Sequence, residues 1–137
     1  LSSANMSSAN MSSAILSSAN LSSANLSRAD LSYADMSGAN LSSAILSSAN
    51  MAGANLSGVP MVDGGLRSDG YRFFLTNFPT EGLRVKAGCR NFPPAKAREH
   101  WAKTRGGTEL GEETLLIIEN MERVAKVRGW NLSGEAT

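Results

Sequence analysis

The chain offers one thiol and one imidazole, at Cys89 and His100, and these two side chains are its candidates for nucleophilic catalysis. A cysteine activated by a histidine is a common nucleophile and base pair, and Glu99 could orient the imidazole. The structural alternative is a small buried cysteine at a strand end and a histidine that packs beside Trp101. One Cys and one His also make a poor transition-metal site. We favour the structural alternative and expect no enzyme, with no catalytic, cofactor-binding or metal-binding residues.

A second candidate site is a row of basic residues around an aromatic ring in one predicted hairpin. Its members are Arg72, Phe74, Arg84 and Lys86, with Arg90 just beyond. Cations contact phosphates and a ring can stack on a base, so this side could bind nucleic acid. The alternative, which we favour, is a solvated sheet face whose Phe74 is covered by a helix. Residues 62–137 hold twelve Lys/Arg and ten Asp/Glu, and this net charge of +2 is weak for a phosphate polymer.

The hairpin itself is predicted by alternating apolar and polar residues at 71–76 and 83–87, after a Gly-rich connector at 63–70. A short helix is expected at 94–104. Its residues available for packing are Ala95, Ala97 and Trp101. A longer helix is expected at about 111–128. Its apolar stripe is Leu115, Ile118, Met121 and Ala125, widened by Ile117 and Val124. Together these elements predict a small α+β module with the order ββαα.

The elements before residue 62 must be of another kind, because a Leu or Met recurs there at every fifth position. An α-helix would turn this series by about 140° per step, and a strand would send successive members to opposite faces. The chain must therefore bend once per pentad. A short extended piece plus a bend, repeated in one sense, winds a solenoid with a row of apolar residues inside. The expected core residues are Leu16, Leu21, Leu26, Leu31, Met36, Leu41, Leu46, Met51 and Leu56.

Units such as ANLSS, ADLSY and ADMSG resemble the signature of pentapeptide-repeat proteins over residues 1 to about 61. The resemblance implies a mainly β fold, a right-handed quadrilateral β-helix with four pentads per coil and about three coils. Ile15 and Ile45 replace the usual Asn or Asp, and on a four-sided coil they would lie on opposite faces. The domains are then a β-helix at 1–62, the connector at 63–70 and the α+β module at 71–137.

The stretch from GYRFFL through RVKAGCRNF to the helix containing HW resembles an uncharacterised module that follows pentapeptide repeats in some bacterial and phage proteins. This resemblance implies a context and no activity. Some family members imitate duplex DNA and dock on DNA gyrase through an acidic solenoid. The repeats here carry only Arg28, Asp30 and Asp35 as charges, so this activity is not expected.

The function predicted from these features is a non-enzymatic structural or protein-interaction protein, in which a rigid solenoid spacer is capped by a C-terminal module that mediates assembly or docking. A phage structural component is one setting, and a cytoplasmic or virion-associated location without a membrane span is expected. A protein partner, a second copy or upstream repeats should cover the first coil, which starts inside a repeat at Leu1. The alternative is a regulator of a nucleic-acid enzyme such as a topoisomerase, or nucleic-acid binding through the basic hairpin side.

Overall fold

The computed structural model describes residues 1–79, 81–87 and 90–132. The chain divides into two compact units, Leu1–Pro60 and Met61–Thr137. The first is called the solenoid and the second the C-terminal unit. No helix in the described part of the chain is both long enough and apolar enough to cross a bilayer.

The solenoid bends at a tight turn in every pentad. In the first, the Ala4 N–H donates to the Leu1 carbonyl at 3.1 Å, and Ser3, the third residue of the turn, has φ of 60°. This is the geometry of a type II turn, which favours glycine at that place. Gly38, Gly53 and Gly58 occupy it in later pentads, with φ between 68° and 74°. Most other pentads place Ser there, and Arg28 and Tyr33 also accept the left-handed backbone.

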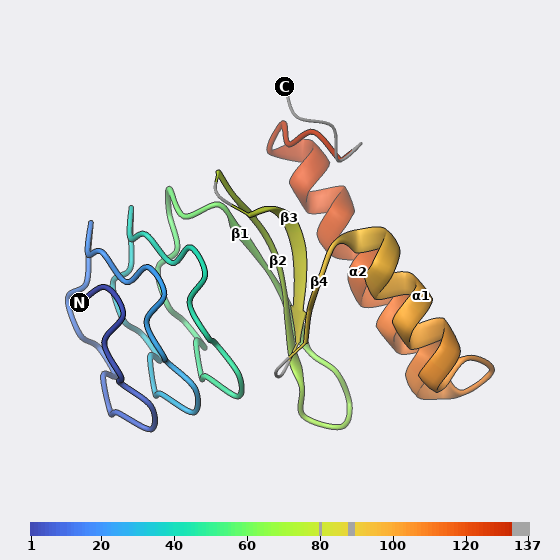
Figure 1. Cartoon of the computed structure of the whole chain (residues 1–137), viewed down its shortest axis with the longest axis horizontal. Helices are drawn as coiled ribbons and strands as arrows, with labels where there is room; N and C mark the ends of the chain where they lie inside the picture. The colour runs from blue at the N-terminus through green and yellow to red at the C-terminus, as the bar shows by residue number, and fades with distance from the viewer. Residues whose placement is uncertain (80, 88–89, 133–137) are drawn as a thin grey trace. The chain divides into compact units, whose positions relative to one another are not determined.

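Successive coils are joined by backbone pairing between residues twenty apart. Parallel bridges connect Asn5 with Asn25 and Asn25 with Ile45 in one column, and five further bridges of the same spacing form three further columns beside it. The Ser3 N–H, for example, donates to the Ser22 carbonyl at 2.8 Å, and the Asn25 N–H to the Ala4 carbonyl at 2.9 Å. Twenty residues correspond to four pentads. The chain therefore winds as a stack of four-sided coils, traced in blue to green in Figure 1.

The interior of the solenoid is filled by the large apolar residue and the Ala of each pentad. The fully or almost fully buried members are Leu21, Leu26, Leu31, Met36, Leu41, Leu46 and Met51, with the alanines from Ala24 to Ala49 beside them. Leu16 and Leu56 are only partly buried, and Leu1 is exposed. Each pentad thus contributes one large and one small side chain to the interior, which explains why neither residue type loses phase along the repeats.

The C-terminal unit contains a four-stranded antiparallel sheet in the order β1-β2-β3-β4. The strands are β1 (Met61–Leu66), β2 (Arg72–Phe78), β3 (Gly82–Ala87) and β4 (Arg90–Phe92). The expected hairpin corresponds to β2 and β3. The predicted order ββαα lacks two strands, because β1 occupies half of the expected connector and β4 is only three residues long.

A bulge in β1 explains why its sequence resembles a connector. Asp63 pairs with Phe74 and Gly65 with Phe73, so Gly64 is an extra residue in the ladder. A Cβ atom on Gly64 would lie 2.6 Å from the sulfur of Met121, so any larger residue would force the side chains of α2 to shift. Gly65 has φ of 81°, which also favours glycine. The two glycines that were assigned to a connector are therefore explained by close packing at Gly64 and by backbone geometry at Gly65.

Two helices, α1 (Pro94–Arg105) and α2 (Glu109–Val127), lie on one side of the sheet (Figure 1). Thr108 caps α2 by accepting the Gly111 N–H on its hydroxyl at 3.0 Å. The core between sheet and helices holds Val62, Phe73, Leu75, Val85, Ala87, Ala97, Trp101, Ile118, Met121 and Ala125. On α1, Ala97 and Trp101 pack as expected, but Ala95 is exposed. On α2, the buried stripe begins at Gly111 and includes Thr114, whereas Leu115, which was predicted to belong to it, is 42% exposed.

Candidate functional site

A buried arginine organises the turn between β1 and β2. The Arg67 side chain is only 4% exposed. Its guanidinium donates to both carboxylate oxygens of Asp69, at 2.7 and 2.8 Å, and to the hydroxyl of Thr114 on α2 at 2.9 Å. It also lies over the rings of Tyr71 and Phe73, 5.4 and 5.3 Å from their centroids. A planar guanidinium suits such a place because it can stack and hydrogen-bond at once.

The same turn is attached to α2 by a carboxylate. Glu113 accepts the Ser68 N–H and the Ser68 hydroxyl, each at 2.6 Å. The Gly70 N–H donates to the Arg67 carbonyl and the Arg67 N–H to the Tyr71 carbonyl, both at 2.8 Å, which closes the turn on itself. The position of Arg67 is therefore fixed both by contacts with α2 and by hydrogen bonds within its own turn.

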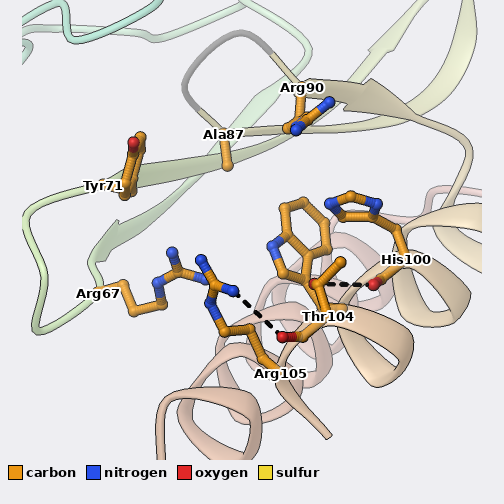
Figure 2. Close-up of a pocket in the computed structure, with 8 residues that line it drawn as sticks. Arg67, Tyr71, Ala87, Arg90, His100, Thr104 and Arg105 are labelled. Carbon is orange, nitrogen blue, oxygen red and sulfur yellow. Dashed lines mark hydrogen bonds between the residues drawn. The ribbon is translucent and has the colours of Figure 1, made fainter.

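A pocket of about 240 Å³ opens beside this arginine. It is called the basic pocket, and the lining residues that matter for its chemistry are Arg67, Arg90, His100, Trp101, Thr104 and Arg105. Figure 2 shows Arg90 on the strand side and His100, Thr104 and Arg105 on the helix side. The Arg105 guanidinium donates only to the Thr104 carbonyl, at 3.1 Å. Within the described residues, neither Arg90 nor Arg105 contacts a carboxylate, and the pocket lining contains no acidic side chain.

Aromatic rings form the wall of the basic pocket on the α1 side. The His100 ring lies 4.9 Å from Phe92 and 5.2 Å from Trp101, measured between centroids. Trp101 in turn contacts Phe73 at 5.2 Å, so its indole is part of the core as well as of the pocket. His100 therefore has the packing environment that the structural alternative predicted. Cys89, the other half of the proposed catalytic dyad, lies outside the described residues.

The sheet register separates the five residues of the proposed nucleic-acid face. Phe74 pairs with Lys86, and Thr76 with Arg84, so these side chains share one face of the sheet. Arg90 pairs with Ala87, and Ala87 with Phe73, which places Arg90 on the opposite face, toward the helices. Grouping Arg90 with the hairpin residues was therefore wrong. The sequence could not show this, because the position of Arg90 follows from the antiparallel pairing of β4 with β3.

Two cations of that hairpin face are bound to carboxylates. The Arg72 guanidinium donates to Asp63 at 2.6 Å, and the Lys86 ammonium to Glu81 at 3.3 Å. Lys86 also lies 5.7 Å from the centroid of the Phe78 ring, and Phe74 is buried. These contacts lower the positive charge that the face would offer to a phosphate.

The solenoid surface is covered by short-range hydrogen bonds that repeat from pentad to pentad. The Oδ1 atom of Asn5 accepts the Ser7 hydroxyl at 2.8 Å and its N–H at 3.2 Å, and the same pair recurs at Asp30 with Ser32. The Ser32 side chain and, to a smaller extent, its backbone N–H lower the pKa of Asp30 below its ordinary value. Ser37 lowers the pKa of Asp35 in the same way. The surface polar groups are thus largely engaged with their neighbours.

The two isoleucines on the solenoid surface are isolated from each other. Ile15 belongs to the column of Asp35 and Asn55, and Ile45 to the column of Asn5 and Asn25. These columns lie on opposite sides of a four-sided coil, as the sequence predicted. No group of three or more His, Cys, Asp or Glu side chains suited to a metal ion occurs among the residues that the structure describes.

The carboxylate of Asp69 gives the C-terminal unit a dependence on pH. The hydrogen bonds from Arg67 hold the pKa of Asp69 below 3.8, although burial opposes them. As the pH falls, Asp69 therefore becomes protonated in the unfolded chain before it does so in the folded protein. The stabilisation from its charge is fully present above pH 3.8 and is lost as the pH falls through the pKa of the folded state. We expect Asp69→Asn to lower the free energy of unfolding by about 2 kcal/mol at neutral pH, because the substitution removes a charged hydrogen-bond partner of Arg67.

Urea denaturation of wild type and Asp69→Asn, from neutral pH down to about pH 2.5, would test this expectation. The difference in unfolding free energy should shrink toward the acid end. A difference that is constant with pH would contradict the role of the carboxylate charge.

Residues 1–32 and 24–59 match the model of the family described as pentapeptide repeats, with 8 copies of the repeat. The resemblance of this segment to pentapeptide-repeat proteins is thereby confirmed, and a β-helix-like solenoid is the fold that such repeats form. Nothing among curated proteins matches the chain. The match ends at residue 59, so the resemblance of the C-terminal unit to an uncharacterised module stays a prediction.

Proposed function

We propose that the protein is a non-enzymatic structural or protein-interaction protein, in which the solenoid is a rigid spacer and the C-terminal unit mediates docking or assembly. The observation that carries this proposal is the repeating pattern of satisfied polar groups on the solenoid. The Asn or Asp side chain of most pentads is bonded to the serine two residues later, and few charges interrupt the pattern. Such a surface is regular and presents few charged or reactive side chains, as is suited to a structural role.

Rigidity follows from the ladder between coils. Backbone N–H groups of one coil donate to carbonyl groups of the next at 2.7 to 2.9 Å, as in Leu16 to Asp35 and Ser23 to Ser42. Bonds of this kind recur in each pentad, so bending the stack would break several of them at once. A right-handed quadrilateral β-helix of about three coils is the form that we propose for this segment.

Docking through the C-terminal unit is supported by apolar side chains that α2 leaves exposed. Leu115 is 42% and Leu116 65% exposed, next to the buried stripe of Thr114 and Ile118. Adjacent exposed leucines on a helix are a frequent element of protein interfaces. Homo-oligomers and larger particles, including phage structures, are assemblies that could use this surface. Coverage of the solenoid end by the same unit stays a prediction.

The proposal is tested by the assembly state of the full-length chain. Mass photometry and cross-linking at increasing concentration should reveal an oligomer, and Leu116→Glu should weaken its formation about tenfold or more, because a charge would be buried at the interface. Ala102→Glu, at an exposed position on α1, introduces the same charge away from the leucine pair and is the matched control, which should leave assembly unchanged. A chain that is monomeric at every concentration and captures no protein partner would refute the proposal.

The alternative function, regulation of a topoisomerase or another nucleic-acid enzyme, lacks such support. Imitation of DNA needs dense negative charge, and the solenoid has only Asp30 and Asp35, each bonded to a serine. Binding of nucleic acid through the hairpin needs free cations, and Arg72 and Lys86 are paired with carboxylates. A supercoiling assay without any effect at low salt would exclude this alternative.

A further inference from the structure

We propose that the basic pocket binds the phosphate group of a small ligand. The pocket gathers three guanidinium groups from three separate places in the fold: Arg67 in the turn after β1, Arg90 at the start of β4 and Arg105 at the end of α1. The proposal is independent of docking or assembly, because the pocket lining does not include the exposed leucines of α2 on which that proposal rests.

The charge of these three groups is not balanced inside the protein. Asp69 neutralises Arg67, whereas Arg90 and Arg105 have no carboxylate partner in the part of the chain that the structure describes. Like charges around one pocket repel each other, and an anion between them removes that repulsion. The excess of two positive charges matches a phosphate dianion better than a single carboxylate.

The N–H donors of Arg67 and Arg105 are also placed to form hydrogen bonds with a phosphate, in addition to attracting its charge. Arg67 is fixed by Asp69 and Thr114, and these contacts use three of its five N–H groups. Two donors remain on a rigid, buried guanidinium. In the part of the chain that the structure describes, the Arg105 guanidinium is bonded only to the carbonyl of the preceding residue, so most of its donors are available as well. Guanidinium groups recognise phosphate through paired N–H donors, which a flexible lysine could not offer in fixed directions.

The size and walls of the basic pocket indicate a small ligand. Its volume of about 240 Å³ lies below the roughly 300–1,000 Å³ of sites for drug-sized molecules, yet exceeds what a bare anion needs. The rings of His100 and Trp101, which meet edge to face, provide a mostly apolar aromatic wall for a carbon skeleton attached to the phosphate. A nucleic-acid strand fits less well, because a continuous basic track is missing. Arg84 and Lys86 lie on the other face of the sheet from Arg90.

Isothermal titration calorimetry of the full-length protein would test the proposal with three probes: inorganic phosphate, phenyl phosphate and a single-stranded oligothymidylate. We expect saturable 1:1 binding of phosphate, and tighter binding of phenyl phosphate because of the aromatic wall. Arg90→Gln and Arg105→Gln should each weaken both about tenfold. Phosphate binding without a gain for phenyl phosphate would still support an anion site and would identify free phosphate as the ligand.

The matched control is Arg123→Gln, which removes the same charge from an exposed position on α2 and should leave binding unchanged. Among the residues that the structure describes, Arg90 and Arg105 make no ion pair, so their variants should keep the wild-type melting temperature, and each is interpreted separately. Equal loss of binding in Arg123→Gln, or no saturable binding of either phosphate compound, would overturn the proposal. Tighter binding of the oligonucleotide that depends on Arg90 and Arg105 would also overturn it, in favour of a nucleic-acid site.

Discussion

Replacing Arg67 with Met is expected to lower the free energy of unfolding of the C-terminal unit by about 3–5 kcal/mol. The variant keeps most of the side-chain volume but removes the guanidinium. Asp69 would lose its bidentate partner and Thr114 a buried donor, and the stacking over Phe73 would lose its charge. Asp69, whose side chain is 32% exposed, would lose its charged partner, and the buried Thr114 hydroxyl would lose a donor, so both losses contribute to this cost.

Urea denaturation followed by tryptophan fluorescence would measure the change, because both tryptophans belong to the C-terminal unit. Arg123→Met is the matched control. This substitution breaks an ion pair with Glu119 at the surface, where the Arg123 side chain is 77% exposed. The free energy of unfolding should therefore fall by less than about 0.5 kcal/mol. If Arg67→Met were as stable as this control, the buried guanidinium would not organise the turn between β1 and β2.

Leu31→Ala is expected to destabilise the solenoid by about 2–5 kcal/mol. Leu31 is completely buried in the middle of the stack, and the alanines beside it, at Ala29 and Ala34, are buried as well. The backbone ladder holds neighbouring coils at fixed spacing, so the structure can collapse only little into the space that the missing atoms leave. The cost should therefore lie in the upper part of this range.

Hydrogen exchange of the backbone amides would locate the effect. The amides of the coils around Leu31 should exchange faster by the factor that corresponds to the lost stability, whereas those of α2 should not change. Ile15→Ala, at a position that is 83% exposed, is the control and should cost less than about 0.5 kcal/mol. Equal effects of the two substitutions would contradict a packed interior.

The sequence allowed the solenoid to be predicted because its fold depends on local periodicity. Leu or Met at every fifth position and Ala two places earlier fixed both the bend and the inward face. The left-handed backbone at the third residue of each turn was missed. Glycine at Gly38, Gly53 and Gly58 is its sequence signal, but serine fills the same place in most pentads and conceals it.

The C-terminal unit was less predictable because its packing depends on residues far apart in the chain. Gly64 appeared to be a linker residue, and only the sulfur of Met121 against it explains the glycine. Thr114 replaced Leu115 in the buried stripe because its hydroxyl receives a hydrogen bond from Arg67, 47 residues earlier. The basic pocket was missed for the same reason. Arg67 and Arg105 have no distinctive sequence context, and the fold alone brings them near Arg90.

The repeat of twenty residues sets a rule for insertions and deletions in the solenoid. Loss of four pentads would leave every remaining surface residue on its own side, whereas loss of one would turn all later residues by a quarter of a circuit relative to the earlier ones. Removing two pentads between Ile15 and Ile45 would align these isoleucines in one column, and an isolated pair of apolar side chains would become a continuous strip. Changes of length are therefore also changes of surface pattern.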